Sequence, residues 1–392
     1  MSEDFVTRLE LQLREAERAQ ERRGRASRAL AAASAWAPSA RAPAAWAAAA
    51  AVAIAAIIAA GPLGSGSDEQ TSGQRDRSIV ADVSLGDFPR AFATGGVSGF
   101  GDVWIGGSER GEVIRVNATT RRVVARVSLG DVAAGAGRLS GIGMTIDAVW
   151  AVVADARGQA TLVRIDPATN RAAARIPLGR RASALAETNR FAGPGLLTTG
   201  RLTPGPNMVW VLGETGAARI DAFHETVADV LSWQLGDSYA DSYALANRDL
   251  WVHANDGRLL RFDALTGVRQ ASFPGAPGKA RIAAIAETGV LVGRDDGTLA
   301  LIDHSTGQQR WHTGLEGSIG QIAIAGRVAW VLSEASRTER LSAVDLASGR
   351  VLRGIALGDP DSDYALAGVA DELWVSTPDG KAVVVRPPRY AG

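Results

Sequence analysis

The side chains best suited to binding a cation or activating water lie in loops that follow a recurring Leu-Gly pair. Two such loops carry several aspartates, and one histidine on an expected strand should approach a neighbouring sheet. These candidate residues are Asp237, Asp241, Asp359, Asp361, Asp363 and His253. Alternating aspartate oxygens can ligate a hard cation such as Ca²⁺, but the glycine and glutamate of a complete calcium loop are missing. Because turn aspartates ordinarily accept backbone N–H groups, we expect solvated turns here, with a Ca²⁺ ion at this rim as the alternative.

The rest of the sequence assigns no catalytic residue. Cysteine is absent, which excludes disulfides, thiolate metal sites and cysteine nucleophiles. There is no G-x-S-x-G elbow, phosphate-binding P-loop, dinucleotide fingerprint or H-x-x-x-H zinc pair. Lys plus Arg and Asp plus Glu both number 42, so the formal net charge is zero, and no basic stripe carries interleaved aromatic residues. This pattern argues against nucleic-acid binding and leaves catalysis unassigned.

From residue 77 onward the chain is organised as a repeat. Each copy has an apolar–Trp–apolar strand, a strand ending in Asp, a turn, and a strand ending in Leu-Gly. The repeated tryptophans are Trp104, Trp150, Trp210, Trp251, Trp330 and Trp374, with Leu291 in the remaining copy. The first and last are 270 residues apart over six steps, a mean period of 45, which suits four short strands per copy. We expect these rings to fill the space between sheets rather than to form a carbohydrate platform.

The two ends of the repeat predict a closed ring. The last copy lacks its final strand, and a matching strand occurs at the start of the repeat. Residues 77–87 (RSIVADVSLGD) match residues 121–131 (RRVVARVSLGD). The N-terminal strand can therefore complete the last sheet and leave no large unpaired edge. The predicted fold class is all-β, a seven-bladed β-propeller over 77–392 that is closed by its own first strand.

Four shorter segments precede the propeller. We expect a cytoplasmic amphipathic helix over 1–30, a linker over 31–42, a transmembrane helix over 43–61 and a flexible Gly/Ser-rich tether over 62–76. The 19 residues of the third segment span about 28 Å as a helix, enough to cross a hydrocarbon core. Eight arginines precede that segment and two follow it closely, which places the N-terminus in the cytoplasm and the propeller outside. A cleaved secretory signal and a buried Ala-rich helix are the alternatives.

One repeat carries a recognisable blade signature. DHSTGQQRW, residues 303–311, is similar to the D-x-x-T-G-x-x-x-W signature of quinoprotein-like repeats, and LWV before a polar turn resembles lyase-like and NHL blades. The chain thus resembles the PQQ-like, YVTN and NHL propellers, a superfamily that includes virginiamycin-B-lyase-like proteins. The resemblance implies blade architecture but no single function, because these families include enzymes, sensors and scaffolds. We expect no bound PQQ, because the vicinal cysteines are absent and one blade alone has the full signature, and no His/Glu metal group aligns with the lyase pattern.

These observations favour a binding function outside the cytoplasm. We expect a single-pass bacterial membrane protein whose propeller binds a protein, a peptide or a cell-wall glycan. Segment 43–61 would contact the lipid bilayer, and segment 1–30 would be available to a cytoplasmic partner. An enzyme of the lyase or hydrolase type, with its site at the channel mouth, is one alternative, and the sensor domain of a transmembrane signalling protein is the other. The enzyme hypothesis predicts that His253 and two carboxylates converge within metal-binding reach.

Overall fold

The computed structural model describes the repeat region of the chain. The described residues are 79–86, 93–99, 101–107, 111–129, 138–145, 147–154, 159–179, 196–198, 208–246, 248–285, 288–335, 338–358, 364–377 and 380–387. The predicted helix, linker, membrane span and tether before residue 77 lie outside these residues. Within these ranges no helix has the length and apolarity needed to span a membrane.

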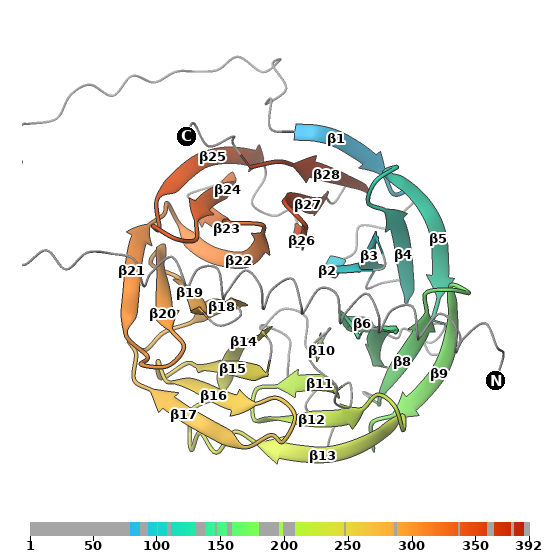
Figure 1. Cartoon of the computed structure of the whole chain (residues 1–392), viewed down its shortest axis with the longest axis horizontal. Helices are drawn as coiled ribbons and strands as arrows, with labels where there is room; N and C mark the ends of the chain where they lie inside the picture. Colours follow the sequence, from blue (N-terminus) through green and yellow to red (C-terminus); the bar gives the residue numbers. More distant parts are fainter. Residues whose placement is uncertain are drawn as a thin grey trace, which may run out of the picture. The chain divides into compact units, whose positions relative to one another are not determined.

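The described residues form seven four-stranded antiparallel sheets arranged as the blades of a wheel (Figure 1). Blades 1 and 2 consist of β2 (Ala93–Gly99), β3 (Asp102–Gly107), β4 (Glu112–Asn117) and β5 (Arg122–Ser128), then β6 (Arg138–Met144), β7 (Val149–Ala154), β8 (Ala160–Asp166) and β9 (Arg171–Pro177). Blades 3 and 4 consist of β10 (Leu196–Thr198), β11 (Met208–Gly213), β12 (Gly216–Asp221) and β13 (Thr226–Ser232), then β14 (Ala240–Ala246), β15 (Asp249–Ala254), β16 (Leu259–Asp263) and β17 (Arg269–Phe273).

The remaining three blades follow the same order, from an inner strand beside the axis to an outer strand at the circumference (Figure 1). Blades 5 and 6 consist of β18 (Ala280–Ile285), β19 (Gly289–Arg294), β20 (Thr298–Asp303) and β21 (Gln309–Gly314), then β22 (Ser318–Ala325), β23 (Val328–Ala335), β24 (Thr338–Asp345) and β25 (Val351–Gly358). Blade 7 consists of β26 (Ala365–Val369), β27 (Glu372–Thr377), β28 (Lys381–Val385) and β1 (Ile79–Ser84).

Strand β1 closes the ring by serving as the outer strand of blade 7. It pairs antiparallel with β28, with Ile79 opposite Val385 and Ser84 opposite Lys381. Val83 is buried in the core cluster that blades 7 and 1 share. The predictions of seven blades and of closure by the N-terminal strand are therefore confirmed, because the first strand supplies the partner that β28 would otherwise lack.

Tryptophan side chains fill the space between neighbouring blades. All six repeated rings are fully buried, with exposed fractions of 0–1%, and Leu291 takes the same place in blade 5. Trp251 of blade 4, for example, packs with Val290 and Val292 of blade 5. A seventh ring, Trp233, is also buried, and its Nε1 donates a hydrogen bond to the carbonyl of Gly213 at 2.8 Å. The sequence pattern missed this residue because it lies after an outer strand and does not recur in the other blades.

In blades 1 to 6 the turn between the third and fourth strands is built around an acidic or amide side chain. In blade 5, Asp303 accepts hydrogen bonds from the N–H groups of Ser305 and Thr306 at 2.9 Å. The hydroxyl of Ser305 and these N–H groups hold the pKa of Asp303 well below its usual range. The same side-chain-to-backbone contact is made by Asn117, Asp166, Asp221, Asp263 and Asp345. These residues therefore shape the hairpins.

In blades 4, 5 and 6 the same turns dock the blade onto the one before it. In blade 6 the turn residue Gly349 has a φ of +71°, a left-handed conformation that favours glycine. It lies against Trp311 of blade 5, whose Nε1 donates to the carbonyl of Leu346 at 3.1 Å. Equivalent turn glycines in blades 5 and 4 meet Phe273 and Leu231. A glycine is thus required here both for its φ and for the close approach of the neighbouring side chain.

Candidate functional site

Two of the predicted site residues, Asp241 and His253, form a buried pair. Asp241 lies at a bulge near the start of β14, where the ladder register shifts between Ala240 and Ser242. His253 lies one residue before the end of β15. The Nδ1 atom of His253 is 2.7 Å from Oδ1 of Asp241, and the two side chains are 2% and 5% exposed. The bulge brings the carboxylate to the histidine, because a bulged residue is displaced from the regular alternation of a strand.

The second oxygen of Asp241 connects blade 4 to blade 5. Its Oδ2 accepts a hydrogen bond from the N–H of Ala280 at 3.2 Å, and the neighbouring Ser242 hydroxyl accepts one from Ile282 N at 3.0 Å. Both donors belong to β18, the inner strand of blade 5. The Asp241–His253 pair therefore helps to fasten adjacent inner strands.

A similar fastening joins blades 6 and 7 without any charged group. Gln321 of β22 accepts a hydrogen bond from Leu366 N at 3.2 Å and donates one to the carbonyl of Tyr364 at 2.6 Å. Gln321 lies opposite Leu332 in the ladder, the register position that Ser242 holds opposite His253. Inner-strand side chains thus satisfy backbone groups of the next blade, which gives Asp241 a structural role that needs no ligand.

His253 differs from its counterparts in one respect. Two residues after the repeated tryptophan, blades 2, 3 and 6 carry the apolar residues Val152, Leu212 and Leu332. His253 replaces them with an imidazole whose Nε2 is buried and has no hydrogen-bond partner among the described residues. Nδ1 faces the carboxylate, and among the described residues no second carboxylate joins this pair to complete a metal site.

The other predicted candidates do not join this pair. Asp237 is exposed in the loop between β13 and β14, and Asp359, Asp361 and Asp363 lie outside the described residues. In the described part of the chain, no group of three or more His, Asp and Glu side chains could hold a metal ion. The convergence of His253 with two carboxylates, which the enzyme hypothesis predicted, is therefore not met there, since one carboxylate reaches the imidazole.

A second polar network, which the sequence did not predict, links the turn between β15 and β16 to the loop between β13 and β14. Asp256, in the turn between β15 and β16, accepts hydrogen bonds from Ser238 Oγ at 2.7 Å and Arg258 Nε at 2.8 Å. Arg258 also donates to the carbonyl of Leu235 at 2.8 Å, and its guanidinium holds the pKa of Asp256 well below its usual range. The N-D-G-R turn was a visible signal, but its partner loop could be identified only from the structure.

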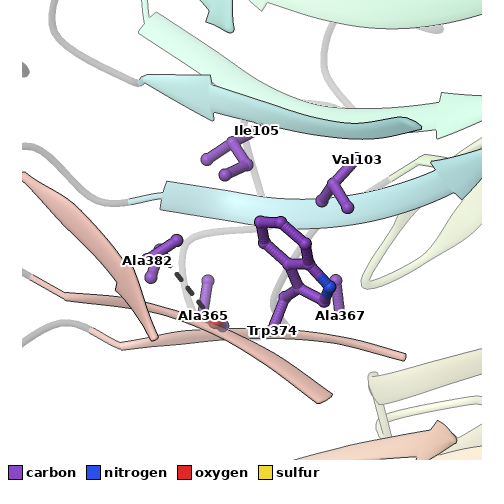
Figure 2. Close-up of a pocket in the computed structure, with 7 residues that line it drawn as sticks. Val103, Ile105, Ala365, Ala367, Trp374 and Ala382 are labelled. Atoms are coloured by element: carbon purple, nitrogen blue, oxygen red, sulfur yellow. Dashed lines mark hydrogen bonds between the residues drawn. The ribbon is translucent and has the colours of Figure 1, made fainter. Parts of the chain in front are cut away.

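A small apolar pocket lies between blades 7 and 1 (Figure 2). It is lined by Val103, Ile105, Ala365, Ala367, Trp374, Ser376 and Ala382. The corresponding space between blades 4 and 5 is occupied by His253 and Leu259, where blade 7 has Ser376 and Ala382. The pocket therefore results from smaller side chains at the closing blade, and its one polar lining side chain, Ser376, bonds to the Ala365 carbonyl at 3.5 Å.

Comparison with known families bears on the last four blades. Residues 255–388 match a family model described as outer membrane protein assembly factor BamB. The matched segment contains the blades in which turn glycines dock on Phe273 and Trp311. Together with the seven-bladed ring, this match supports the PQQ-like propeller superfamily that the blade signature indicated. No curated protein matches the sequence.

The buried pair of this propeller leads to a stability prediction. His253→Leu, which introduces the residue found in blades 3 and 6, should destabilise the propeller by about 3 kcal/mol because it leaves the Asp241 carboxylate buried without the imidazole. Asp241→Ser should cost less, since the hydroxyl can still meet Ala280 N. The double variant should be more stable than the sum of the two single effects predicts. Urea unfolding measures all three, and strict additivity would show that the two side chains are not coupled.

Proposed function

We propose that this propeller is a protein-binding scaffold held at the outer surface of the cytoplasmic membrane. The observation that carries the proposal is the match of residues 255–388 to a family described as an outer membrane protein assembly factor. The ring of seven sheets, closed by its own first strand, provides a framework for such binding. Interactions of this kind use exposed loops that a rigid framework positions.

We assign the binding face to the rim formed by the loops that follow the outer strands. The loop between β13 and β14 presents Tyr239, which is 36% exposed, beside the exposed Asp237. Hydrogen bonds from Tyr239 N to Asn255 Oδ1, at 3.0 Å, and from Ser238 to Asp256 fix this loop. Such a fixed, partly exposed aromatic ring supports a protein contact, because tyrosine buries a large area at low entropic cost.

Site-specific crosslinking tests this assignment. A photo-crosslinking amino acid at Tyr239 should trap a protein partner in intact cells. The matched control is Phe223, which is 81% exposed at the opposite end of blade 3, in the turn between β12 and β13. Adducts that form at Phe223 but not at Tyr239 would place the binding face on the other side of the ring. No adduct at either position would argue against a scaffold.

The membrane attachment is tested separately. The proposed span over 43–61 predicts that the full chain stays in the membrane after an alkaline wash and that external protease degrades the propeller of spheroplasts. Release by the wash would indicate a cleaved signal, and protection from protease would indicate the opposite orientation.

A further inference from the structure

The outer walls of blades 1 and 2 expose two matching columns of arginine. Arg122 and Arg126 are exposed on β5, and Arg171 and Arg175 are exposed at the same positions of β9. A ladder register shift lies between the two arginines of each strand, so the pair on each strand does not share one face of its sheet, although all four side chains are exposed at the circumference. The small or aliphatic residues Val124 and Ala173 lie between the arginines of each column and are exposed as well.

Most of this positive charge is not neutralised by the protein. The side chains of Arg122, Arg171 and Arg175 make no hydrogen bond or ion pair within the described residues. Arg126 meets Glu112 at 3.2 Å and the carbonyl of Leu85. Exposed guanidinium groups that lack internal partners keep all their donors available, and those donors match the geometry of phosphate oxygens.

Other described arginines of these two blades, Arg115, Arg121 and Arg164, have internal partners. Arg115 donates to Asp102 at 2.6 Å, and Arg164 donates to Asp147 at 3.0 Å. Outer strands elsewhere also differ, because β13 exposes Asp229 and the exposed Arg310 of β21 binds Asp303. Arg269 on β17 and Arg350 before β25 are also exposed without a side-chain partner among the described residues, but blades 1 and 2 carry three such arginines on two adjacent outer strands.

This wall lies beside the point at which the chain enters the propeller. Strand β1, the first of the ring, neighbours β5 at the circumference (Figure 1). No more than 17 residues separate the end of the proposed span, at residue 61, from Ile79. A propeller attached through this tether would therefore have blades 1 and 2 close to the lipid surface.

We propose that the wall formed by Arg122, Arg126, Arg171 and Arg175 docks on the anionic phospholipid headgroups of the membrane to which the chain is attached. The guanidinium groups bind headgroup phosphates, and the two columns spread the contact over both blades. Docking through the outer walls of blades 1 and 2 leaves the rim that carries Tyr239, at one end of the blades, open to partners. The inference rests on the proposed membrane attachment.

A fluorescence experiment on the full chain tests the docking. Because the chain contains no cysteine, Ala173→Cys provides a single labelling site within the arginine wall for an environment-sensitive dye. In vesicles that contain phosphatidylglycerol, a lipid-borne quencher should reduce the emission several-fold more than in phosphatidylcholine vesicles. High salt should reverse the difference, because exposed charges are screened. Replacing Arg122, Arg171 and Arg175 by Gln should abolish it.

The matched control is Gln270→Cys on β17, an exposed outer-strand site in blade 4. Its dye should respond equally in both kinds of vesicle. Equal quenching at Ala173→Cys and Gln270→Cys, or quenching that does not depend on the anionic lipid, would overturn the proposal. The same result is expected if the wall binds an acidic protein instead of lipid. Retention of the same chain in washed vesicles tests the membrane attachment independently. Crosslinking at Tyr239 tests the binding of a protein partner. Failure of either proposal can therefore be distinguished from failure of docking.

Discussion

Val83→Asp is expected to open the wheel at its closing blade. Val83 is 3% exposed on β1, in the cluster that also contains Val103, Ile105 and Trp374. A carboxylate there would be buried without a cationic partner in that cluster, at a cost of about 4 kcal/mol or more. Because β1 is the only described strand that pairs with the outer edge of β28, its detachment exposes that edge and the apolar surface beneath it. The expected result is cooperative loss of the propeller at lower urea concentration, with early proteolysis of β1.

Ser84→Asp is the matched control for this variant. Ser84 is the next residue of the same strand, opposite Lys381, and its side chain is exposed. The same new charge on the solvent side should leave the unfolding midpoint nearly unchanged, since it neither enters the core nor loses a pairing partner. If both variants unfold alike, the added charge rather than the buried contact accounts for the loss, and β1 would not act as the closing strand.

The wheel could be predicted from the sequence because its determinants repeat. The tryptophan that recurs with a mean period of 45 residues gives the number of blades. The similarity of residues 77–87 to residues 121–131 predicts that the first strand closes the ring. These signals depend on strand alternation and on the need to pair edges, which act alike in every blade. The site was less predictable, because the contact between Asp241 and His253 depends on a bulge that the alternation pattern does not reveal.

The arginine wall shows a different limit of sequence reasoning. The shared positions of Arg122 with Arg171, and of Arg126 with Arg175, are visible in the aligned repeats. Whether those charges are free depends on which acidic groups lie nearby. The structure shows that Glu112 reaches Arg126, whereas the other three side chains have no partner among the described residues. Composition alone, with equal numbers of acidic and basic residues, concealed this local excess.

Gly349→Ala is expected to weaken the docking of blade 6 on blade 5. Gly349 has a φ of +71°, and a Cβ atom there would lie 2.6 Å from Cε3 of Trp311. The substitution therefore adds a steric clash of about 2 kcal/mol to the cost of about 1 kcal/mol for an alanine in the left-handed region. The ring cannot retreat freely, because its Nε1 is bonded to the Leu346 carbonyl. The unfolding free energy from urea titration should fall by about 3 kcal/mol in total.

Gly236→Ala separates these two costs. Gly236 has a φ of +69°, but no atom lies within 4 Å of the position its Cβ would take. This control should lose only about 1 kcal/mol, the conformational part. Trp311→Leu supplies the converse test, because removing the ring should make the added cost of Gly349→Ala fall to that of Gly236→Ala. If Gly349→Ala and Gly236→Ala were equally destabilised, the ring would not be docked on the turn. The close glycine–tryptophan contact would then not be what joins these two blades of the propeller.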